Sequence, residues 1–145
     1  SMGHAAAIGL GIALNQPQKQ IIVLDGDGAL LMHMGILSSV GYYQPKNYRH
    51  IVLDNEAYET TGNQETTSAT TDMVNVALAC GYRNAQSVSE GEKLRETLKE
   101  MMKQEGPSLL RVKINHLPTQ GIPRISTQYT SVDIAQNFRK DLLNA

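Results

Sequence analysis

The sequence lacks several features that mark whole classes of protein. Cysteine is nearly absent: Cys80 is the single one in 145 residues, which excludes a disulfide framework and predicts a reducing, cytoplasmic environment. No apolar run approaches the ~20 residues of a membrane span, so we expect no membrane partner. An excess of positive charge is also lacking, because 13 Lys and Arg stand against 14 Asp and Glu. Nucleic-acid binding needs a clustered basic face, so this balance argues against nucleic acid as the main partner.

The first residues lack the features of a secretory signal. Residues 1–14 are rich in Ala and Gly but have no basic lead. They are typical of a loop that enters a packed helix, and neither a strand nor a polar tail precedes them. We therefore expect the chain to be the later part of a longer protein, or one subunit of a two-chain enzyme. The length and the 41% of hydrophobic residues are sufficient for a buried core, and only 19% of the residues are charged. We therefore predict one compact domain over residues 1–145.

Strand and helix patterns alternate along the chain. Continuous apolar runs such as QIIVLD and RHIVLD are typical of strands buried on both faces of a parallel sheet. We predict strands at residues 20–25, 49–54, 85–88 and 108–114, and helices at residues 5–15, 30–43, 71–80, 89–104 and 132–143. This alternation predicts an α/β fold, a three-layer αβα sandwich around a mostly parallel sheet. Residues 55–71 are predicted to form a long functional loop, and residues 118–130 an irregular tail.

The glycine-rich segment Asp25-Gly26-Asp27-Gly28 follows the first predicted strand and allows several interpretations. Taken alone, it is most simply a turn with solvated aspartates. A calcium loop is excluded because Ala29 and Ile36 stand where oxygen ligands are needed. A dinucleotide fingerprint would have to begin earlier, where Gly9 and Gly11 have its first spacing. It is excluded there because Leu14 occupies the place of the third glycine and no strand precedes Gly9.

Taken together, the ends of the first two predicted strands indicate a ligand site. One helix and one strand separate Gly28 from Asp54, so both ends are expected at the same sheet edge, where α/β proteins bind ligands. Asp27 offers a carboxylate, Asn55 an amide oxygen and Ala57 a backbone carbonyl. This oxygen set suits Mg²⁺, with substrate phosphates and water completing the shell. The glycines beside Asp27 would let a diphosphate approach the backbone and the start of the next helix.

The Gly-Asp-Gly turn, followed one helix and one strand later by an asparagine at a strand end, resembles the diphosphate-binding signature of thiamine-diphosphate enzymes. Asp54-Asn55 stands where many members carry two asparagines, and the ligand position is retained. The resemblance implies that Mg²⁺ is held by Asp27, Asn55 and the Ala57 carbonyl. It implies that thiamine diphosphate contacts Met2, Gly3, Gly26, Asp27, Gly28, Ala29, Leu30, Asn55, Ala57 and Tyr58.

Longer phrases narrow the resemblance. SMGHA, DGDGALLMHMG, DNEAYETTGNQ and ACGYR are similar to the decarboxylases of phosphonopyruvate and sulfopyruvate. The implied reaction is non-oxidative decarboxylation of a 3-substituted anionic pyruvate to an aldehyde and CO₂, with the cofactor as electron sink. The family also needs a glutamate on a pyrimidine-binding domain, which this chain lacks. The implied partner is therefore that domain or an alpha subunit, in a homo- or hetero-oligomer.

Individual side chains near the implied cofactor remain open to two interpretations. Family members carry a bulky apolar residue at Met2 that bends the cofactor, although a methionine there could simply fill a gap. His4 and His33 are candidate proton donors; His4 is the better catalytic candidate because it adjoins Met2, and packing is expected for His33. Polar residues of the loop could bind the substrate anion or only cap the sheet edge, and Glu59 is expected to face water.

Two other functions are compatible with the cofactor signature. An acetolactate-synthase-like carboligase shares that signature, but it should carry a longer chain and a flavin domain. A non-catalytic subunit could keep the fold for assembly or regulation. Retention of both Asp27 and Asn55 argues against this last alternative, because a subunit that binds no cofactor has no need of both.

Overall fold

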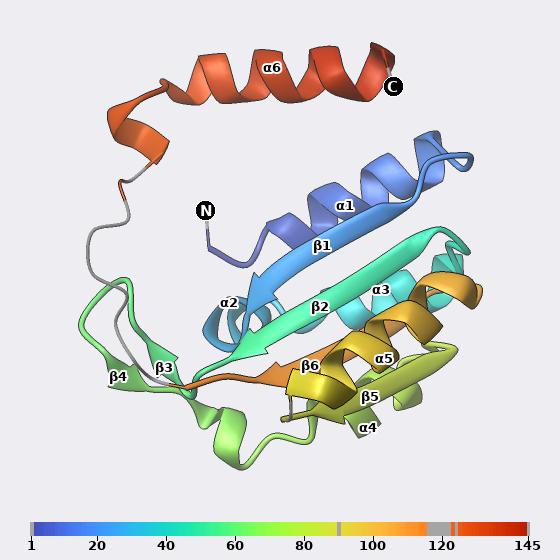
Figure 1. Ribbon diagram of the computed structural model, residues 1–145, viewed down its shortest axis with the longest axis vertical. Coiled ribbons are helices and arrows are strands. Elements are labelled where there is room, and N and C mark those ends of the chain that lie inside the picture. Colours follow the sequence, from blue (N-terminus) through green and yellow to red (C-terminus); the bar gives the residue numbers. More distant parts are fainter. Residues whose placement is uncertain (1, 90, 116–122, 124, 145) are drawn as a thin grey trace.

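The computed structural model describes residues 2–89, 91–115, 123 and 125–144. A four-stranded sheet in the order β1-β2-β6-β5 forms its centre, and every pairing in it is parallel (Figure 1). The strands are β1 (Ile21–Gly26), β2 (Tyr48–Asp54), β5 (Asn84–Val88) and β6 (Ser108–Lys113). All four predicted strands and the α/β class are confirmed.

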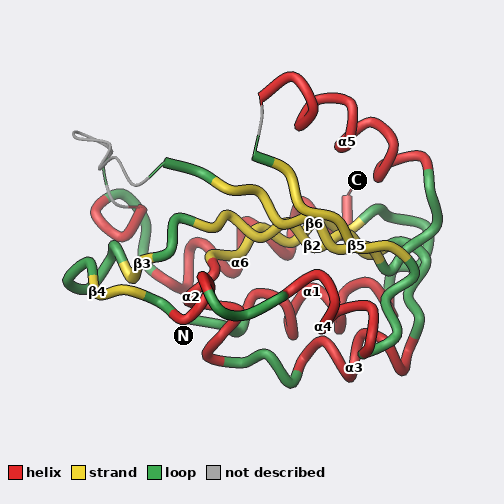
Figure 2. The backbone as a smooth tube through the Cα atoms, turned by 90° about the horizontal axis from the view of Figure 1, so that it is seen from below, coloured by secondary structure: helices red, strands yellow, loops and turns green. Residues whose placement is uncertain are grey.

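Helices cover both faces of the sheet, as predicted for a three-layer sandwich (Figure 2). α1 (Ala5–Asn15), α3 (Ile36–Tyr43) and α4 (Met73–Ala79) lie on one face, and α5 (Gly91–Lys103) lies on the other. Parallel strands are joined by right-handed crossovers. The chain advances from β1 through β2 to β5 and then returns to β6, and this reversal places α5 on the opposite face.

Each face of the sheet carries its own apolar core, because the strand side chains alternate. The core under α1, α3 and α4 is the larger one and includes Leu10, Val23, Leu37, Val52 and Met73. The core under α5 is built from Ile51, Val88, Met101, Leu110 and Val112. The predicted continuous apolar runs are therefore strands buried on both faces over most of the sheet.

On the face of the sheet that carries α5, the side chains of β1 are left exposed. Leu24 pairs in register with Ile51 of the α5 core, so Leu24 and its neighbour Ile22 point to this face. Their side chains are nevertheless 63% and 47% exposed. β1 is also the edge strand of the described sheet. This part of the sheet carries an apolar surface that the described residues do not cover.

Two predictions about local structure are wrong. The helix predicted over residues 30–43 is two helices, α2 (Asp27–Met32) and α3, because His33 leaves the helical conformation with φ −135°. The segment predicted as a loop contains a short antiparallel hairpin and a 3₁₀ turn. These are β3 (Ala57–Tyr58), β4 (Gln64–Glu65) and η1 (Thr67–Ala69).

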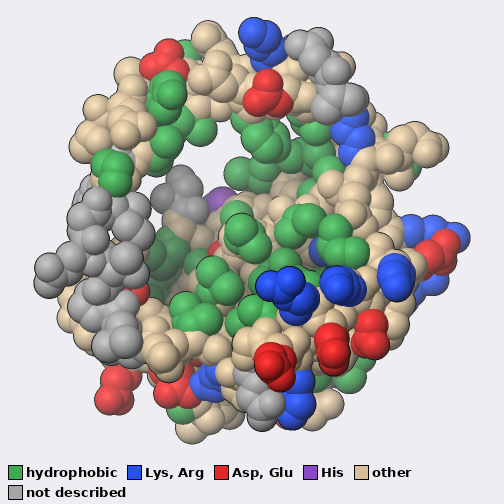
Figure 3. Space-filling view, in the orientation of Figure 1, with side chains coloured by type: hydrophobic (Ala, Val, Ile, Leu, Met, Phe, Trp, Pro, Cys, Tyr) green, Lys and Arg blue, Asp and Glu red, His purple; other side chains and the backbone are tan. Residues whose placement is uncertain are grey.

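The chain ends in a 3₁₀ turn, η2 (Ile125–Thr127), and in helix α6 (Ser131–Asn144). Of the predicted irregular tail, residues 118–122 and 124 lie outside the described residues. Val132 and Phe138 of α6 are more than half exposed. The space-filling view shows hydrophobic side chains of α6 and of the central part of the molecule around a hollow (Figure 3). No helix in the described ranges is long and apolar enough to cross a membrane.

Candidate functional site

The ends of β1 and β2 meet at one edge of the sheet, as predicted from the sequence. The two strands are parallel neighbours, and Gly26 pairs in register with Leu53. Asp27 follows β1 directly at the start of α2, and Asn55 follows β2. The geometry therefore places the two predicted ligand residues beside each other at the carboxyl ends of adjacent strands.

A cavity of about 300 Å³ opens at this edge. Its volume lies at the small end of the range for ligand pockets. It is lined by most of the predicted cofactor-binding residues, namely Met2, Gly26, Asp27, Gly28, Ala29, Asn55, Ala57 and Tyr58. Four further residues complete the wall: Leu53, Glu59, Thr60 and Ile114. Glu59, expected to face water, is exposed but also forms part of this wall.

Three predicted site residues lie outside the cavity wall. Leu30 is buried in the larger core, so only its backbone could contact a diphosphate. Gly3 has φ +84°, and a Cβ there would lie 2.3 Å from His33 Nδ1, so this turn requires glycine. The His4 ring packs against the His33 ring, with 4.4 Å between centroids and a 56° tilt between the ring planes. The roles assigned to these three residues stay predictions.

Gly28 permits a close approach inside the wall. A Cβ on Gly28 would lie 2.4 Å from the Tyr58 ring, so only glycine lets the hairpin pack against the start of α2. A Cβ on Gly26 would meet nothing within 4 Å. Space therefore remains over the backbone at Gly26, which is the approach that a diphosphate would need.

Asn55 is oriented by two hydrogen bonds. Its Oδ1 accepts from the Ala57 N–H at 3.1 Å, and its Nδ2 donates to Glu59 Oε2 at 3.2 Å. The amide oxygen therefore points toward the backbone of Ala57 and keeps a second lone pair. No group of three His, Cys, Asp or Glu side chains suited to a metal is found in the described part of the chain. The predicted cation set of the Asp27 carboxylate, the Asn55 amide oxygen and the Ala57 carbonyl contains a single carboxylate and stays a prediction.

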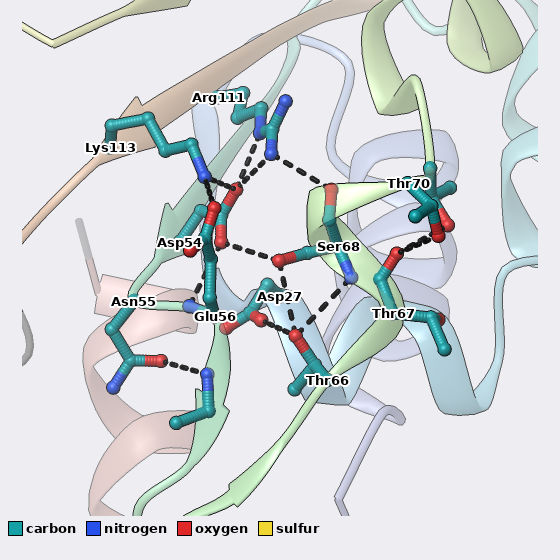
Figure 4. A network of polar contacts seen from close by, with 12 residues as sticks. Asp27, Asp54, Asn55, Glu56, Thr66, Thr67, Ser68, Thr70, Arg111 and Lys113 are labelled. Atoms are coloured by element: carbon teal, nitrogen blue, oxygen red, sulfur yellow. Dashed lines mark hydrogen bonds and ion pairs between the residues drawn. The ribbon is translucent and has the colours of Figure 1, made fainter.

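Asp54 lies at the centre of a buried polar cluster that was not predicted from the sequence (Figure 4). Its carboxylate is fully buried; it accepts from Ser68 Oγ at 2.9 Å and from Arg111 Nε at 2.5 Å, and Lys113 Nζ lies 3.3 Å away. Burial would raise the pKa of Asp54, but the Ser68 hydrogen bond and the two cations hold that pKa below its usual value. The carboxylate is therefore an ionised anchor. One sequence signal was present, an acidic residue at the end of an apolar strand.

A 3₁₀ turn links this cluster to the cavity. Thr66, which precedes η1, donates its hydroxyl proton to Asp27 Oδ2 at 2.5 Å. Asp27 is 1% exposed, so its carboxylate is held inside the protein although it lines the cavity. Neither Thr66 nor Ser68 was predicted from the sequence as a site residue.

A second buried polar group lies deeper on the same face of the sheet. His50 Nε2 lies 3.4 Å from Asp25 Oδ2, and His50 Nδ1 lies 3.4 Å from the Tyr82 hydroxyl. Tyr48 donates to the Ala6 carbonyl at 3.1 Å. Burial raises the pKa of Tyr48 and of Tyr82, so both hydroxyls keep their protons. This group does not line the cavity.

The fold and the site together define a class of protein. It is a parallel α/β domain with a ligand cavity at the carboxyl ends of two adjacent strands, walled by glycines and oxygen donors. Residues 1–112 match the family described as thiamine pyrophosphate enzyme, C-terminal TPP binding domain. The chain belongs to this family.

Curated relatives are similar over most of this chain. It is 38% identical to a phosphonopyruvate decarboxylase of Streptomyces viridochromogenes, over 96% of this chain and 34% of the relative. It is 37% identical to the beta subunit of a sulfopyruvate decarboxylase of Methanococcus maripaludis, over 91% of this chain and 70% of the relative. The beta subunit of Methanocaldococcus jannaschii sulfopyruvate decarboxylase is 49% identical over 64% of this chain and 50% of the relative. The chain therefore spans about a third of the length of the phosphonopyruvate decarboxylase.

A solved structure supports the fold. A Mycobacterium smegmatis protein assigned to the thiamin diphosphate-dependent enzymes superposes with a TM-score of 0.66 at 18% identity. The match covers 81% of this chain and 23% of the other chain. At this identity the similarity bears on the architecture alone.

Proposed function

We propose that this chain is the diphosphate- and magnesium-binding half of a thiamine-diphosphate-dependent decarboxylase. The substrate class proposed is a 3-substituted anionic pyruvate, either phosphonopyruvate or sulfopyruvate. The observation that carries the proposal is the meeting of Asp27 and Asn55 at one cavity, on adjacent strand ends, in a chain of this family. The relatives named for these two substrates support the choice of subgroup.

The cavity suits the diphosphate end of the cofactor. Asp27, Asn55 and the carbonyl of Ala57 would hold Mg²⁺, because a hard cation prefers oxygen ligands. The open backbone at Gly26 would receive diphosphate oxygens. When bound, thiamine diphosphate supplies the electron sink for loss of CO₂. The chain's own task would be to orient that group, and Met2 on the cavity wall would support its rings.

A partner would complete the site. The exposed apolar side chains Ile22 and Leu24 on the edge strand leave a surface suited to a further protein element. We propose that the pyrimidine-binding domain or alpha subunit supplies the family's glutamate, in a homo- or hetero-oligomer in the cytoplasm. If so, the isolated chain should associate with itself or with that partner in analytical ultracentrifugation. A strictly monomeric and stable isolated chain would count against a missing partner.

The substrate anion would also depend on the partner. Among the residues that line the described cavity, Asp27 and Glu59 are acidic and none is Lys or Arg. A phosphonate or sulfonate is best bound by cations. We therefore assign the anion-binding cations to the partner domain, with Thr60 on the cavity wall as a neutral hydrogen-bonding group from this chain.

The test is CO₂ release by the assembled enzyme, with the pyrimidine-binding domain, thiamine diphosphate and Mg²⁺ present. Phosphonopyruvate, sulfopyruvate and pyruvate would be compared. Turnover confined to one of the two 3-substituted acids would support the proposal and identify the substrate. Acetolactate formed from pyruvate would instead favour the carboligase alternative. Cofactor binding without turnover of any of the three would favour a non-catalytic subunit.

A further inference from the structure

A hydrogen bond restrains the orientation of the Asp27 carboxylate. Thr66 Oγ1 donates to Asp27 Oδ2 at 2.5 Å, and both side chains are buried. A hydroxyl carries a single proton. Thr66 Oγ1 also lies 3.1 Å from Ser68 Oγ, but its contact with the Asp27 carboxylate is much shorter, and a charge-assisted hydrogen bond is the stronger of the two, so we assign the proton to Asp27. The hydrogen bond therefore fixes one carboxylate oxygen of a residue that lines the cavity.

The Thr66 hydroxyl is itself held in place by the turn that follows it. Its oxygen accepts from the Ser68 N–H at 3.3 Å while its proton points to Asp27. The Thr66 N–H donates to the Glu56 carbonyl at 2.9 Å, which ties the same residue to the hairpin. Thr66 thus has its backbone, its hydroxyl oxygen and its proton all engaged.

The turn is anchored in the protein interior by an ion pair. Ser68, 1% exposed, donates its hydroxyl proton to Asp54 Oδ1 at 2.9 Å. Arg111 of β6 donates to the Ser68 carbonyl at 3.0 Å and to Asp54 Oδ2 at 2.5 Å. Figure 4 shows these contacts running from the cations on β6 through Asp54 and Ser68 to Thr66 and Asp27. The position of the Thr66 hydroxyl therefore depends on two strands of the central sheet.

We propose that Thr66 is a positioning residue that holds Asp27 in the orientation required by Mg²⁺, with the turn at Ser68 anchored by Asp54 and Arg111. This inference rests on the proposed function, in which Asp27 is a ligand of the cation. It adds a residue outside the ligand set and predicts how that residue affects the choice of metal.

The choice of metal follows from the geometry that each ion tolerates. Mg²⁺ demands nearly ideal octahedral coordination at about 2.0–2.1 Å, whereas Ca²⁺ accepts irregular shells at about 2.3–2.6 Å. A carboxylate that has lost its orienting hydrogen bond remains a ligand but samples more orientations. Loss of the Thr66 hydroxyl should therefore weaken Mg²⁺ binding more than Ca²⁺ binding.

The experiment compares Thr66→Val, Thr66→Ser and Thr67→Val in the assembled enzyme. Valine removes the hydroxyl at nearly constant shape, and serine restores the hydroxyl. Thr67 is the matched control, because it is exposed and its backbone carbonyl, rather than its side chain, makes the contacts with Thr70 and Thr71. Mg²⁺ and Ca²⁺ affinities would each be measured by titration calorimetry at a fixed thiamine diphosphate concentration. Circular dichroism would follow the thermal unfolding of each variant.

The expected result is a loss of Mg²⁺ affinity of about 10- to 100-fold in Thr66→Val, the range typical of outer-shell partners. The loss of Ca²⁺ affinity should be several-fold smaller. Thr66→Ser should recover most of the Mg²⁺ affinity, and Thr67→Val should resemble the wild type. Equal losses for the two ions, or no recovery in Thr66→Ser, would overturn the proposal and leave a merely structural role.

Two further variants separate the possible failures. Asp27→Ala tests the proposed function: unchanged Mg²⁺ affinity in that variant would remove Asp27 from the ligand set. A loss in Asp27→Ala together with wild-type behaviour of Thr66→Val would overturn only the positioning role. If Thr66→Val does not fold, Ser68→Ala decides instead, because it frees the turn from Asp54 and keeps the Thr66 hydroxyl. It too should lose Mg²⁺ affinity more than Ca²⁺ affinity, and equal losses would overturn the proposal.

Discussion

Two buried polar groups lie on the same face of the central sheet. They differ in the length of their polar contacts and in whether they reach the cavity. The outer group, Asp27, Asp54, Thr66, Ser68 and Arg111, contains a carboxylate paired with a guanidinium at 2.5 Å and reaches the cavity. The inner group, Asp25, His50, Tyr48 and Tyr82, has side-chain contacts of 3.4 Å around His50 and does not reach it. Members of both groups are buried, so burial alone does not separate the two groups. Contact with the cavity distinguishes the two groups.

Asp27→Ala should produce the largest effect of the substitutions considered. If it had no effect, the distinction between the outer and the inner polar group would be lost. We expect Mg²⁺-dependent retention of thiamine diphosphate to fall on the order of 100-fold or more, because a direct ligand matters at least as much as an outer-shell partner. Retention after gel filtration, with and without Mg²⁺, measures this. Asp133→Ala on α6, outside the cavity wall, is the control. Undiminished retention in Asp27→Ala would show that contact with the cavity does not make the outer group necessary for cofactor binding.

Arg111→Met tests how far the outer group depends on its ion pair. Removing the guanidinium leaves the fully buried Asp54 carboxylate without its main partner. Loss of one partner of a buried pair costs about 3–5 kcal/mol, and Lys113 nearby should keep the loss near about 3 kcal/mol. Urea unfolding measures the change in the free energy of unfolding. The matched control is Arg83→Met at the exposed pair with Glu105, where we expect little change. Equal effects of the two substitutions would contradict the importance of burial.

Tyr82→Phe tests whether the inner polar group contributes to stability alone or also affects the cavity. The substitution removes the hydroxyl that lies 3.4 Å from His50 and leaves the aromatic packing intact. We expect the free energy of unfolding to fall by about 1 kcal/mol, which is typical of one hydrogen bond. Mg²⁺ affinity should not change, in contrast to Thr66→Val. A loss of Mg²⁺ affinity in Tyr82→Phe would mean that the inner group also acts on the site.

The smallest effect is expected at an exposed carboxylate, Asp72, which caps α4. Its hydrogen bonds with the Asn75 N–H and side chain hold the pKa of Asp72 below its usual value. Its stabilisation is therefore present above the ordinary pKa of about 3.9 and is lost as the pH falls through the lowered folded value. Asp72→Ala should melt at a lower temperature than the wild type at pH 7, and the gap should narrow below about pH 4.

Asp72→Asn is the control for the charge of this cap. Asparagine also caps helices well, so this variant should lie between the wild type and Asp72→Ala at pH 7. Thermal unfolding followed by circular dichroism from pH 7 to pH 3 would measure all three proteins. A gap between Asp72→Ala and the wild type that stays constant with pH would argue against a stabilising charge.

Much of the fold could be predicted from local sequence, and each of the two errors has its own physical reason. The apolar strands and the proline after α1 are local signals, and the structure confirms the elements that they predicted. The break at His33 was missed because the apolar spacing continues across it, while the ring packs on His4 from a distant turn. The hairpin in the polar loop was missed because each of its strands has only two residues.

By itself, the sequence determined the parallel α/β order and the placement of Asp27 and Asn55 at one edge. Both follow from chain direction and strand spacing, because each parallel strand returns its end to the same side of the sheet. Only the tertiary structure decided which groups meet there. Thr66 and Asp27 are 39 residues apart, and Arg111 and Asp54 are 57 apart. A hydrogen bond acts over about 3 Å, so such contacts exist only once β6 and the turn at Ser68 have packed against the end of β2.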